Sequence, residues 1–170
     1  MNNKYLLLEE AVNRASLPYR QNTDIYIYDG KGNVIARDMG SFIDFPGGGV
    51  DAGETLQQAA VREAMEEVGA IVEKVVLHDT LSYLWPPEFA DTPKRKQRYK
   101  KFKGSSKSFL SARVKKLVKP TSKEGDAWST DKLWMPIDKV IKLIKKTITD
   151  ETKEFRMMQI NTLTKVKRLK

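Results

Sequence analysis

The chain has 170 residues, the size of one ordinary domain, with 40% apolar and 31% charged residues. This composition supports a packed core and excludes a chain that is disordered throughout. With no cysteine and one histidine, a disulfide framework, a thiolate zinc site and a cysteine nucleophile are also excluded. Any bound metal ion must therefore rely on oxygen ligands.

No apolar run approaches the roughly 20 residues that a membrane helix needs. The run Leu6-Leu7-Leu8 is too short to form the core of a signal peptide. We therefore expect a cytoplasmic protein without a membrane partner.

The net charge of +9 comes from 31 Lys and Arg against 22 Asp and Glu, a balance that favours phosphate-rich partners. The excess is concentrated in one segment, 92–110, which contains no acidic residue. Its cations are Lys94, Arg95, Lys96, Arg98, Lys100, Lys101, Lys103 and Lys107.

The first predicted element is a β-hairpin. Residues 24–28 are β-prone, Asp29-Gly30-Lys31-Gly32 forms a tight turn, and 33–37 supplies the second strand.

A helix is predicted over 56–68, after the breaker Pro46-Gly47-Gly48-Gly49. Thr55 and Gln58 have the spacing of a capping box, and Gly69 ends the helical apolar pattern.

The remaining elements alternate between strands and helices. Strands are predicted at 71–84, 109–118 and 133–137, and helices at 138–148 and about 151–166. Together with the hairpin, this order predicts one α/β domain over 1–170, with a mixed β-sheet covered by helices. We expect His78 to be a structural residue of a strand and Trp134 to pack in the core.

The helix over 56–68 has two chemically different sides. Its apolar side is predicted to carry Val61, Ala64, Met65 and Val68, and its opposite side Glu63, Glu66 and Glu67. Three carboxylates at this spacing repel one another unless a cation shares the space. A hard divalent ion such as Mg²⁺ is one such cation, and an ordinary solvated helix face is the alternative.

The spacing of the charged and glycine residues decides between these interpretations. Gly48 is followed after five residues by Glu54, and after seven more by the run 62–70, Arg-Glu-Ala-Met-Glu-Glu-Val-Gly-Ala. This pattern over 48–70 resembles the Nudix box, G-x5-E-x7-R-E-U-x-E-E-x-G-U, although Ala64 and Ala70 are small for its apolar positions. The chain thus resembles the Nudix hydrolases over the box and, in element order, from about Tyr19 to Ile144.

The resemblance implies both a fold and an activity. Nudix hydrolases are α/β/α sandwiches that use a divalent metal, Mg²⁺ or Mn²⁺, to hydrolyse a diphosphate linkage in a nucleoside diphosphate derivative. It assigns Glu66 and Glu67 as the main metal ligands, Glu63 as a further ligand or general base, Arg62 and Glu54 as a structural ion pair, and the carbonyl of Gly47 or Gly48 as a metal ligand.

Short segments outside the box resemble bacterial RNA pyrophosphohydrolases and dinucleoside polyphosphate hydrolases. They are Tyr19-Arg20-Gln21-Asn22, Thr92-Pro93-Lys94-Arg95, Gly104 with Phe109-Leu110, and Glu124-Gly125-Asp126-Ala127-Trp128. This similarity implies a polyphosphate substrate, such as a 5′-triphosphorylated RNA end, and makes Glu124 a candidate metal ligand. The chain departs from that subgroup at Gly47, where the subgroup has glutamine.

The basic segment has two interpretations. It could be a mobile, solvated loop, as most charge runs are, or it could bind a polyphosphate, with Tyr99 and Phe102 available to stack on bases. The candidate substrate-binding residues are Arg20, Lys94, Arg95, Arg98 and Tyr99.

Two other functions compete with this interpretation. The spacing of Pro86 from the box resembles that in ADP-ribose pyrophosphatases, so ADP-ribose or another nucleotide sugar is an alternative substrate. A rigid turn that closes a strand would also explain this proline. The different-class alternative is a nucleotide- or RNA-binding module that has lost catalysis. The intact set of box glutamates in this chain argues against that alternative.

Overall fold

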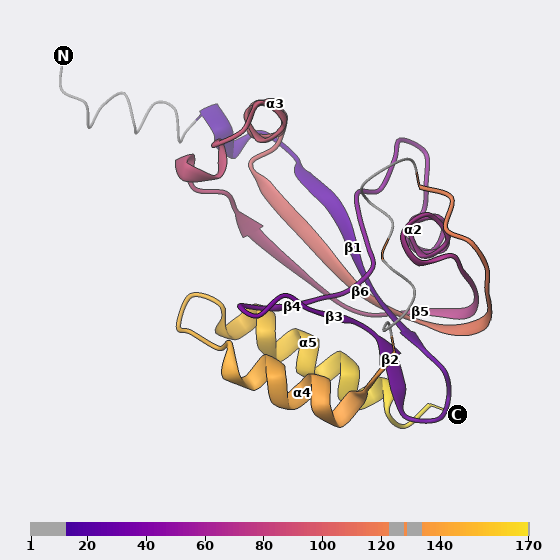
Figure 1. Ribbon diagram of the computed structural model, residues 1–170. Coiled ribbons are helices and arrows are strands. Elements are labelled where there is room, and N and C mark those ends of the chain that lie inside the picture. The colour runs from indigo at the N-terminus through magenta and orange to yellow at the C-terminus, as the bar shows by residue number, and fades with distance from the viewer. Residues whose placement is uncertain (1–12, 123–127, 129–133, 170) are drawn as a thin grey trace, which may run out of the picture.

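The structure is a computed structural model, and it describes residues 13–122, 128 and 134–169 of the chain. A five-stranded sheet lies at its centre, with the strand order β5-β6-β1-β2-β7 (Figure 1). The strands are β1 (Tyr19–Tyr28), β2 (Asn33–Ile35), β5 (Ala70–Leu84), β6 (Gly104–Leu117) and β7 (Trp134–Pro136).

The sheet is mixed, as the sequence predicts. β1 and β6 run parallel, with a register from Tyr19 opposite Gly104 to Tyr28 opposite Arg113. The remaining neighbours, β1–β2, β2–β7 and β5–β6, pair antiparallel. The predicted hairpin is present, with Tyr28 opposite Val34.

The second strand of that hairpin is shorter than predicted. β2 ends at Ile35, and Arg37 already belongs to a separate two-stranded sheet of β3 (Arg37–Asp38) and β4 (Ile43–Asp44). The side chains of Arg37 and Asp44 form an ion pair of 2.5 Å across these two strands. This hairpin leads the chain into the glycine turn of the box.

Four helices and one short 3-10 helix complete the described residues. They are α2 (Leu56–Val68), η1 (Pro87–Phe89), α3 (Pro93–Lys101), α4 (Ile137–Lys146) and α5 (Lys153–Val166). None of them is long and apolar enough to cross a membrane.

The loop interpretation of the basic segment is wrong. Residues 93–101 form α3, and 104–108 form the first part of β6, so the strand begins five residues earlier than predicted. Thr92 caps α3, since its side chain accepts a hydrogen bond from the backbone N–H of Arg95. The charge run conceals both elements because they lack the apolar periodicity on which the prediction depends.

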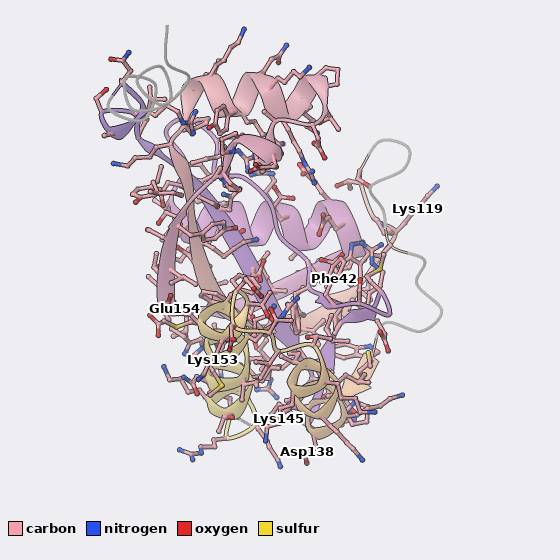
Figure 2. All side chains as sticks on the ribbon, turned by 90° about the vertical axis from the view of Figure 1, so that its left-hand side faces the viewer. Phe42, Lys119, Asp138, Lys145, Lys153 and Glu154 are labelled. Carbon is pink, nitrogen blue, oxygen red and sulfur yellow. The ribbon has the colours of Figure 1, made fainter. Side chains whose placement is uncertain are left out.

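The sheet is covered on both faces, as Figure 1 shows. Side chains alternate along β1, so Ile25 and Ile27 pack against α2, whereas Tyr26 and Tyr28 belong to the core beneath α4 and α5. These layers give an α/β/α sandwich. The outer faces of α4 and α5 carry charged side chains, including Asp138, Lys145, Lys153 and Glu154 (Figure 2).

Candidate active site

Helix α2 has the bounds that the sequence predicts because local signals fix both ends. The Thr55 hydroxyl accepts the N–H of Gln58 at 3.2 Å, and the Gln58 side chain accepts the N–H of Thr55 at 2.8 Å. Gly69 ends the helix with a left-handed φ of 63°, and its N–H bonds to the Met65 carbonyl. This capping box and glycine cap fix the register of every box residue between them.

The apolar face of α2 differs in one respect from the prediction. Ala60, Ala64 and Val68 are fully buried against the sheet, but Val61 is 44% exposed. The buried stripe is therefore made mainly of small residues, and the alanine at position 64 lets the helix lie close to the sheet. The close packing brings Glu67 within hydrogen-bonding distance of the glycine turn, at the backbone N–H of Gly47.

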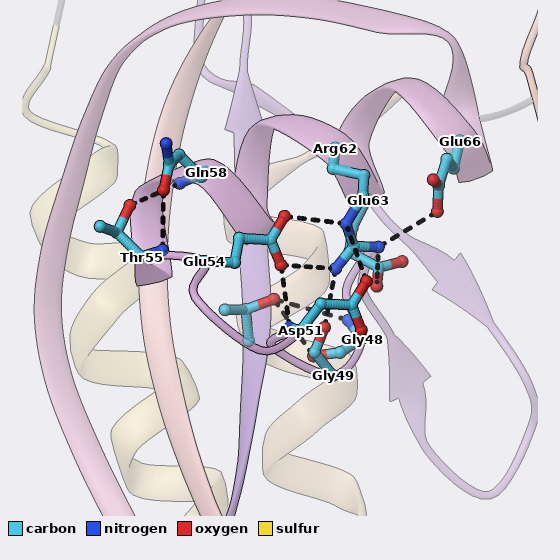
Figure 3. A network of polar contacts seen from close by, with 10 residues as sticks. Gly48, Gly49, Asp51, Glu54, Thr55, Gln58, Arg62, Glu63 and Glu66 are labelled. Carbon is cyan, nitrogen blue, oxygen red and sulfur yellow. Dashed lines mark hydrogen bonds and ion pairs between the residues drawn. The ribbon is translucent and has the colours of Figure 1, made fainter.

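Arg62 lies at the centre of a polar network between α2 and the glycine turn (Figure 3). Its Nε and Nη2 atoms each lie 2.9 Å from one Glu54 oxygen, a bidentate pair, and Nη2 also donates to the Gly49 carbonyl at 2.8 Å. This ion pair holds the pKa of Glu54 below its ordinary value and raises that of Arg62. The network ties the helix to the turn.

The same guanidinium also contacts two of the box carboxylates. Arg62 Nη1 donates to Glu63 Oε1 at 2.8 Å and to Glu66 Oε2 at 3.2 Å. Glu63 is 12% exposed and Glu66 is 41% exposed, so the two carboxylates lie at different depths. Arg62 therefore neutralises part of the acidic cluster and sets the orientation of its members.

Glu67 lies apart from Arg62 and accepts a hydrogen bond from the backbone N–H of Gly47 at 2.9 Å. Burial raises its pKa to about 7, and the negative charge of Glu63 adds to this effect. Burial also raises the pKa of Glu63, although Arg62 opposes the shift. Raised pKa values on two neighbouring carboxyls show that burial disfavours their charged forms, a perturbation that is common at functional sites.

The glycine turn is bonded to β1 and passes close to these carboxylates. Thr23 donates its N–H to the Gly48 carbonyl at 2.8 Å, and Ile25 donates to the Pro46 carbonyl at 2.8 Å. A Cβ at Gly47, whose φ is +155°, would overlap the backbone carbonyl of Thr23, so the close approach of the turn to β1 requires glycine at this position. A Cβ at Gly48 would instead meet the end of the Glu63 side chain. The Gly48 carbonyl also accepts a longer hydrogen bond, of 3.4 Å, from the Thr23 hydroxyl.

The chemistry of the box carboxylates and the glycine turn suits a hard divalent cation. They supply only oxygen donors, and burial disfavours the charged forms of Glu63 and Glu67 unless a cation is present, which suits Mg²⁺ or Mn²⁺. Within the described residues, no three Asp, Glu or His side chains already converge on one point. The reason is that Arg62 engages Glu63 and Glu66 while the Gly47 amide engages Glu67.

Arg20 connects this cluster to the basic helix α3. Its guanidinium lies against Gly49 and hydrogen-bonds to the Asn22 side chain. Burial and the nearby charge of Arg98 lower the pKa of Arg20, whereas Glu63 acts in the opposite direction. Arg20 lies on β1 opposite Ser105, which follows the end of α3, and its guanidinium reaches the glycine turn of the box.

The other predicted binding residues lie further out. Lys94 and Arg95 are exposed, and Arg95 pairs with Asp91 at 2.8 Å. The Tyr99 ring is covered by the Arg14 guanidinium, 3.3 Å from its centroid, so that face is not open to a base. Glu124 lies outside the described residues.

Sequence reasoning missed a buried ion pair on the sheet. Lys107 Nζ lies 2.6 Å from Asp24 Oδ1, and both side chains are largely buried. Burial lowers the pKa of Lys107, but Asp24 raises it more. Lys107 therefore belongs to the sheet, although the sequence groups it with the surface charge run.

Three further predicted residues have structural roles. His78 lies in the edge strand β5 and bonds to the Ser111 hydroxyl at 2.7 Å. Trp134 packs against the core beneath α2. Trp128 is buried, and its N–H donates to the Glu67 carbonyl at 2.8 Å.

Comparison with known proteins adds an independent result to this geometry. The family model described as NUDIX domain matches residues 18–160. An RNA pyrophosphohydrolase of Dinoroseobacter shibae is 40% identical over 85 residues, which are 44% of this chain and 51% of that protein. An 8-oxo-dGTP diphosphatase of Haemophilus influenzae is 40% identical over 50 residues, 29% of this chain and 37% of that protein. The chain thus spans about half, or less, of the length of these relatives.

Solved structures share the fold at lower identity. A NUDIX hydrolase from Nitrosomonas europaea superposes with a TM-score of 0.57 at 17% identity, covering 89% of this chain and 92% of that one. An ADP compounds hydrolase superposes with a TM-score of 0.55 at 20% identity, covering 89% of this chain and 74% of that one. These likenesses support the α/β/α architecture described above.

Proposed function

The chain belongs to the Nudix family, and on that premise we propose that it is a divalent-metal-dependent hydrolase of a diphosphate linkage in a nucleoside diphosphate derivative. One observation carries the proposal. Two half-buried carboxyls with raised pKa values, Glu63 and Glu67, lie beside a glycine turn that Arg62 ties to their helix.

The residues that would hold the metal ion are Glu63, Glu66, Glu67 and the Gly48 carbonyl, with Glu124 as a further candidate. When bound, Mg²⁺ or Mn²⁺ neutralises the diphosphate and lowers the pKa of a water molecule. Arg62 contributes by holding Glu63 and Glu66 in fixed orientations on a rigid helix.

A proton must leave the attacking water, and a box carboxylate is the candidate acceptor. Glu63 is the candidate general base, because its raised pKa makes it a better proton acceptor than an ordinary surface glutamate. If Glu63 binds the metal and Glu67 does not, Glu67 is the next candidate. In either residue, a carboxylate oxygen accepts the proton.

A polyphosphate is the substrate class that we favour, such as a 5′-triphosphorylated RNA end or a dinucleoside polyphosphate. The Arg20 guanidinium supports it, because it lies against Gly49 of the box turn and carries a charge that phosphates extending past the cleaved bond would meet. The relatives named RNA pyrophosphohydrolase agree with this choice.

ADP-ribose or another nucleotide sugar is the alternative substrate. Its only sequence mark is Pro86, which precedes η1 at the end of β5, where the Trp85 and Phe89 rings stack with centroids 4.0 Å apart. This local packing accounts for the proline without a ligand.

A hydrolysis panel with Mg²⁺ or Mn²⁺ tests the proposal. The substrates are 5′-triphosphorylated RNA, a diadenosine polyphosphate, ADP-ribose and a nucleoside triphosphate, each with the wild type and with Glu67→Gln. We expect hydrolysis of a polyphosphate that a chelator and the substitution both abolish. Binding without hydrolysis of any substrate would favour the inactive binding module, and preference for ADP-ribose would favour the alternative substrate.

A further inference from the structure

Helix α3 differs from α2, α4 and α5 because it buries no side chain. It has nine residues, Pro93–Lys101, of which six are Lys or Arg and none is acidic. Short helices in proteins are normally stabilised by packing an apolar face, and like charges on neighbouring turns weaken them. Packing against the core therefore does not explain why this segment is helical, and its high positive charge needs a different explanation.

The position of α3 is nevertheless fixed. Arg14 Nη2 donates to the Phe102 carbonyl at 3.1 Å and to the Lys103 carbonyl at 3.3 Å, while its guanidinium covers Tyr99. Backbone bonds from Lys103 to Pro18 and from Trp85 to Lys103 fix the end of the helix. A cation thus anchors the cationic helix, which adds to the local positive charge.

Few of these charges are compensated. Among the described residues, Asp91 is the one acid that pairs with α3, through Arg95. The four lysines of the helix have no described carboxylate within 4.0 Å, the limit for an ion pair. They are Lys94, Lys96, Lys100 and Lys101, and all are exposed.

The end of α3 lies beside the start of β1, since the backbone N–H of Lys103 donates to the Pro18 carbonyl and Arg20 lies opposite Ser105. Arg98, one turn before the end of the helix, acts electrostatically on Arg20, which lies against Gly49 and close enough to Glu63 to be affected by its charge. A chain of phosphates that starts at the carboxylates of α2 would therefore pass Arg20 and Arg98 and continue over the lysines of α3.

We propose that α3 is a docking surface for the phosphate backbone of a single-stranded RNA whose 5′ end lies at the box. The inference rests on the proposed function. Contact is with phosphates, because six of the nine residues of α3 are Lys or Arg and Arg14 covers one face of the Tyr99 ring. A membrane surface fits less well, since interfacial helices bury an apolar face that α3 does not have.

The first test measures RNA binding without turnover. Lys96, Lys100 and Lys101 are replaced together by Gln in a Glu67→Gln background, since Gln keeps helix propensity. The matched control replaces Lys142, Lys145 and Lys146 of α4, which are exposed and change the net charge equally. The probe is a 5′-triphosphorylated single-stranded RNA of about twelve nucleotides, followed by fluorescence anisotropy over about 50 to 200 mM salt.

We expect the α3 variant to bind about tenfold more weakly and its salt slope to fall by about 2, because each lost phosphate contact removes about 0.7 from the slope for a single strand. The α4 variant should bind as the Glu67→Gln parent does. Equal weakening in both variants, or in neither, would overturn the proposal. Displacement of the RNA by polyglutamate of equal charge would also overturn it, because α3 would then be a general anion surface.

The second test separates this inference from the proposed function. In an active background, the α3 variant should raise the KM for the RNA, leave kcat unchanged and leave hydrolysis of a nucleoside triphosphate unaffected, because that substrate does not reach the lysines. α3-dependent RNA binding by a protein that hydrolyses nothing would contradict the proposed function alone. Active hydrolysis with no effect of the α3 variant on the RNA would contradict the docking surface alone.

Discussion

Helices α2 and α3 are both capped by a threonine, but only α2 is part of the core. In α2, Ala60, Ala64 and Val68 are fully buried, whereas α3 buries none of its side chains. Packing against the core therefore fixes the positions of the charged side chains of α2. Catalytic groups need such fixed positions. The charged surface of α3 supplies electrostatic attraction without that precision, which is sufficient to capture a polyanion.

The two helices also differ in how their charges are compensated. Two acids of α2 and one from the turn before it surround Arg62, whose side chain bonds to Glu63, Glu66 and Glu54. In the described part of the chain, the bases of α3 have only Asp91. The difference indicates that the carboxylates of α2 suit a single small cation, whereas the cations of α3 suit an extended chain of phosphates.

Removing a box carboxylate should have the largest effect. We expect Glu67→Gln and Glu66→Gln each to reduce turnover at least about a hundredfold, because metal charge stabilisation contributes several kcal/mol to catalysis. Steady-state kinetics at saturating metal measures this. The control is Glu154→Gln, an exposed residue of α5. Near wild-type rates in both box variants would rule out their assignment as metal ligands.

Arg62→Ala should reduce stability as well as rate. It leaves Glu54 and Glu63, which are 14% and 12% exposed, without their cation. We expect a loss of about 2 kcal/mol in the free energy of unfolding, below the roughly 3 to 5 kcal/mol of a fully buried pair. Denaturant unfolding of the metal-free protein measures it.

Arg62→Lys is the matched variant for this prediction. It keeps the charge but cannot reproduce the bidentate contact with Glu54, so it should recover only part of the stability. An unchanged melting temperature and turnover in Arg62→Ala would show that the network is not needed for the site.

The raised pKa of Glu67 predicts how stability depends on pH. Its folded value is about 7, against 4.5 for an unperturbed side chain, so between these values the folded state binds more protons than the unfolded state. The free energy of unfolding of the metal-free protein should therefore fall as pH rises from about 4.5 to about 7. Mn²⁺ should restore stability above that range, because it competes with the proton.

Glu67→Gln removes the titrating group and should flatten this part of the profile. Melting temperatures over the pH range, with and without Mn²⁺, measure both effects. A metal-free wild type whose stability instead rises over the same range would mean that Glu67 is charged and compensated within the protein.

The smallest effect comes from the helix caps and compares the two helices directly. Thr55→Ala and Thr92→Ala each remove one side-chain acceptor for an N–H three residues on. A lost cap costs about 1 kcal/mol, which should appear in global stability for α2 but only as local fraying for α3. Amide exchange and denaturant unfolding separate the two outcomes, and equal global losses would show that α3 is part of the cooperative core.

The part of the fold that the sequence predicts well depends on local signals. The capping box at Thr55, Gly69 at the other end and the box spacing fix α2 and its carboxylates, because each signal acts within one or two turns. The predicted helix 151–166 also agrees, since α5 is Lys153–Val166.

The remaining features depend on contacts between distant segments. Lys107 and Asp24 are 83 residues apart in sequence, so no local pattern pairs them, and the charge run conceals the strand that carries Lys107. The Arg14 contact that covers Tyr99 is of the same kind. The exposed Val61 results from the close packing of the three alanines of α2, Ala59, Ala60 and Ala64, which shifts the buried stripe away from it.

The most direct test of this division between α2 and α3 is a paired measurement of kcat and KM on one 5′-triphosphorylated RNA. We predict that Glu67→Gln lowers kcat at least about a hundredfold, whereas the triple α3 variant raises KM and leaves kcat unchanged. A lowered kcat in the α3 variant, or an unchanged kcat in Glu67→Gln, would contradict the account.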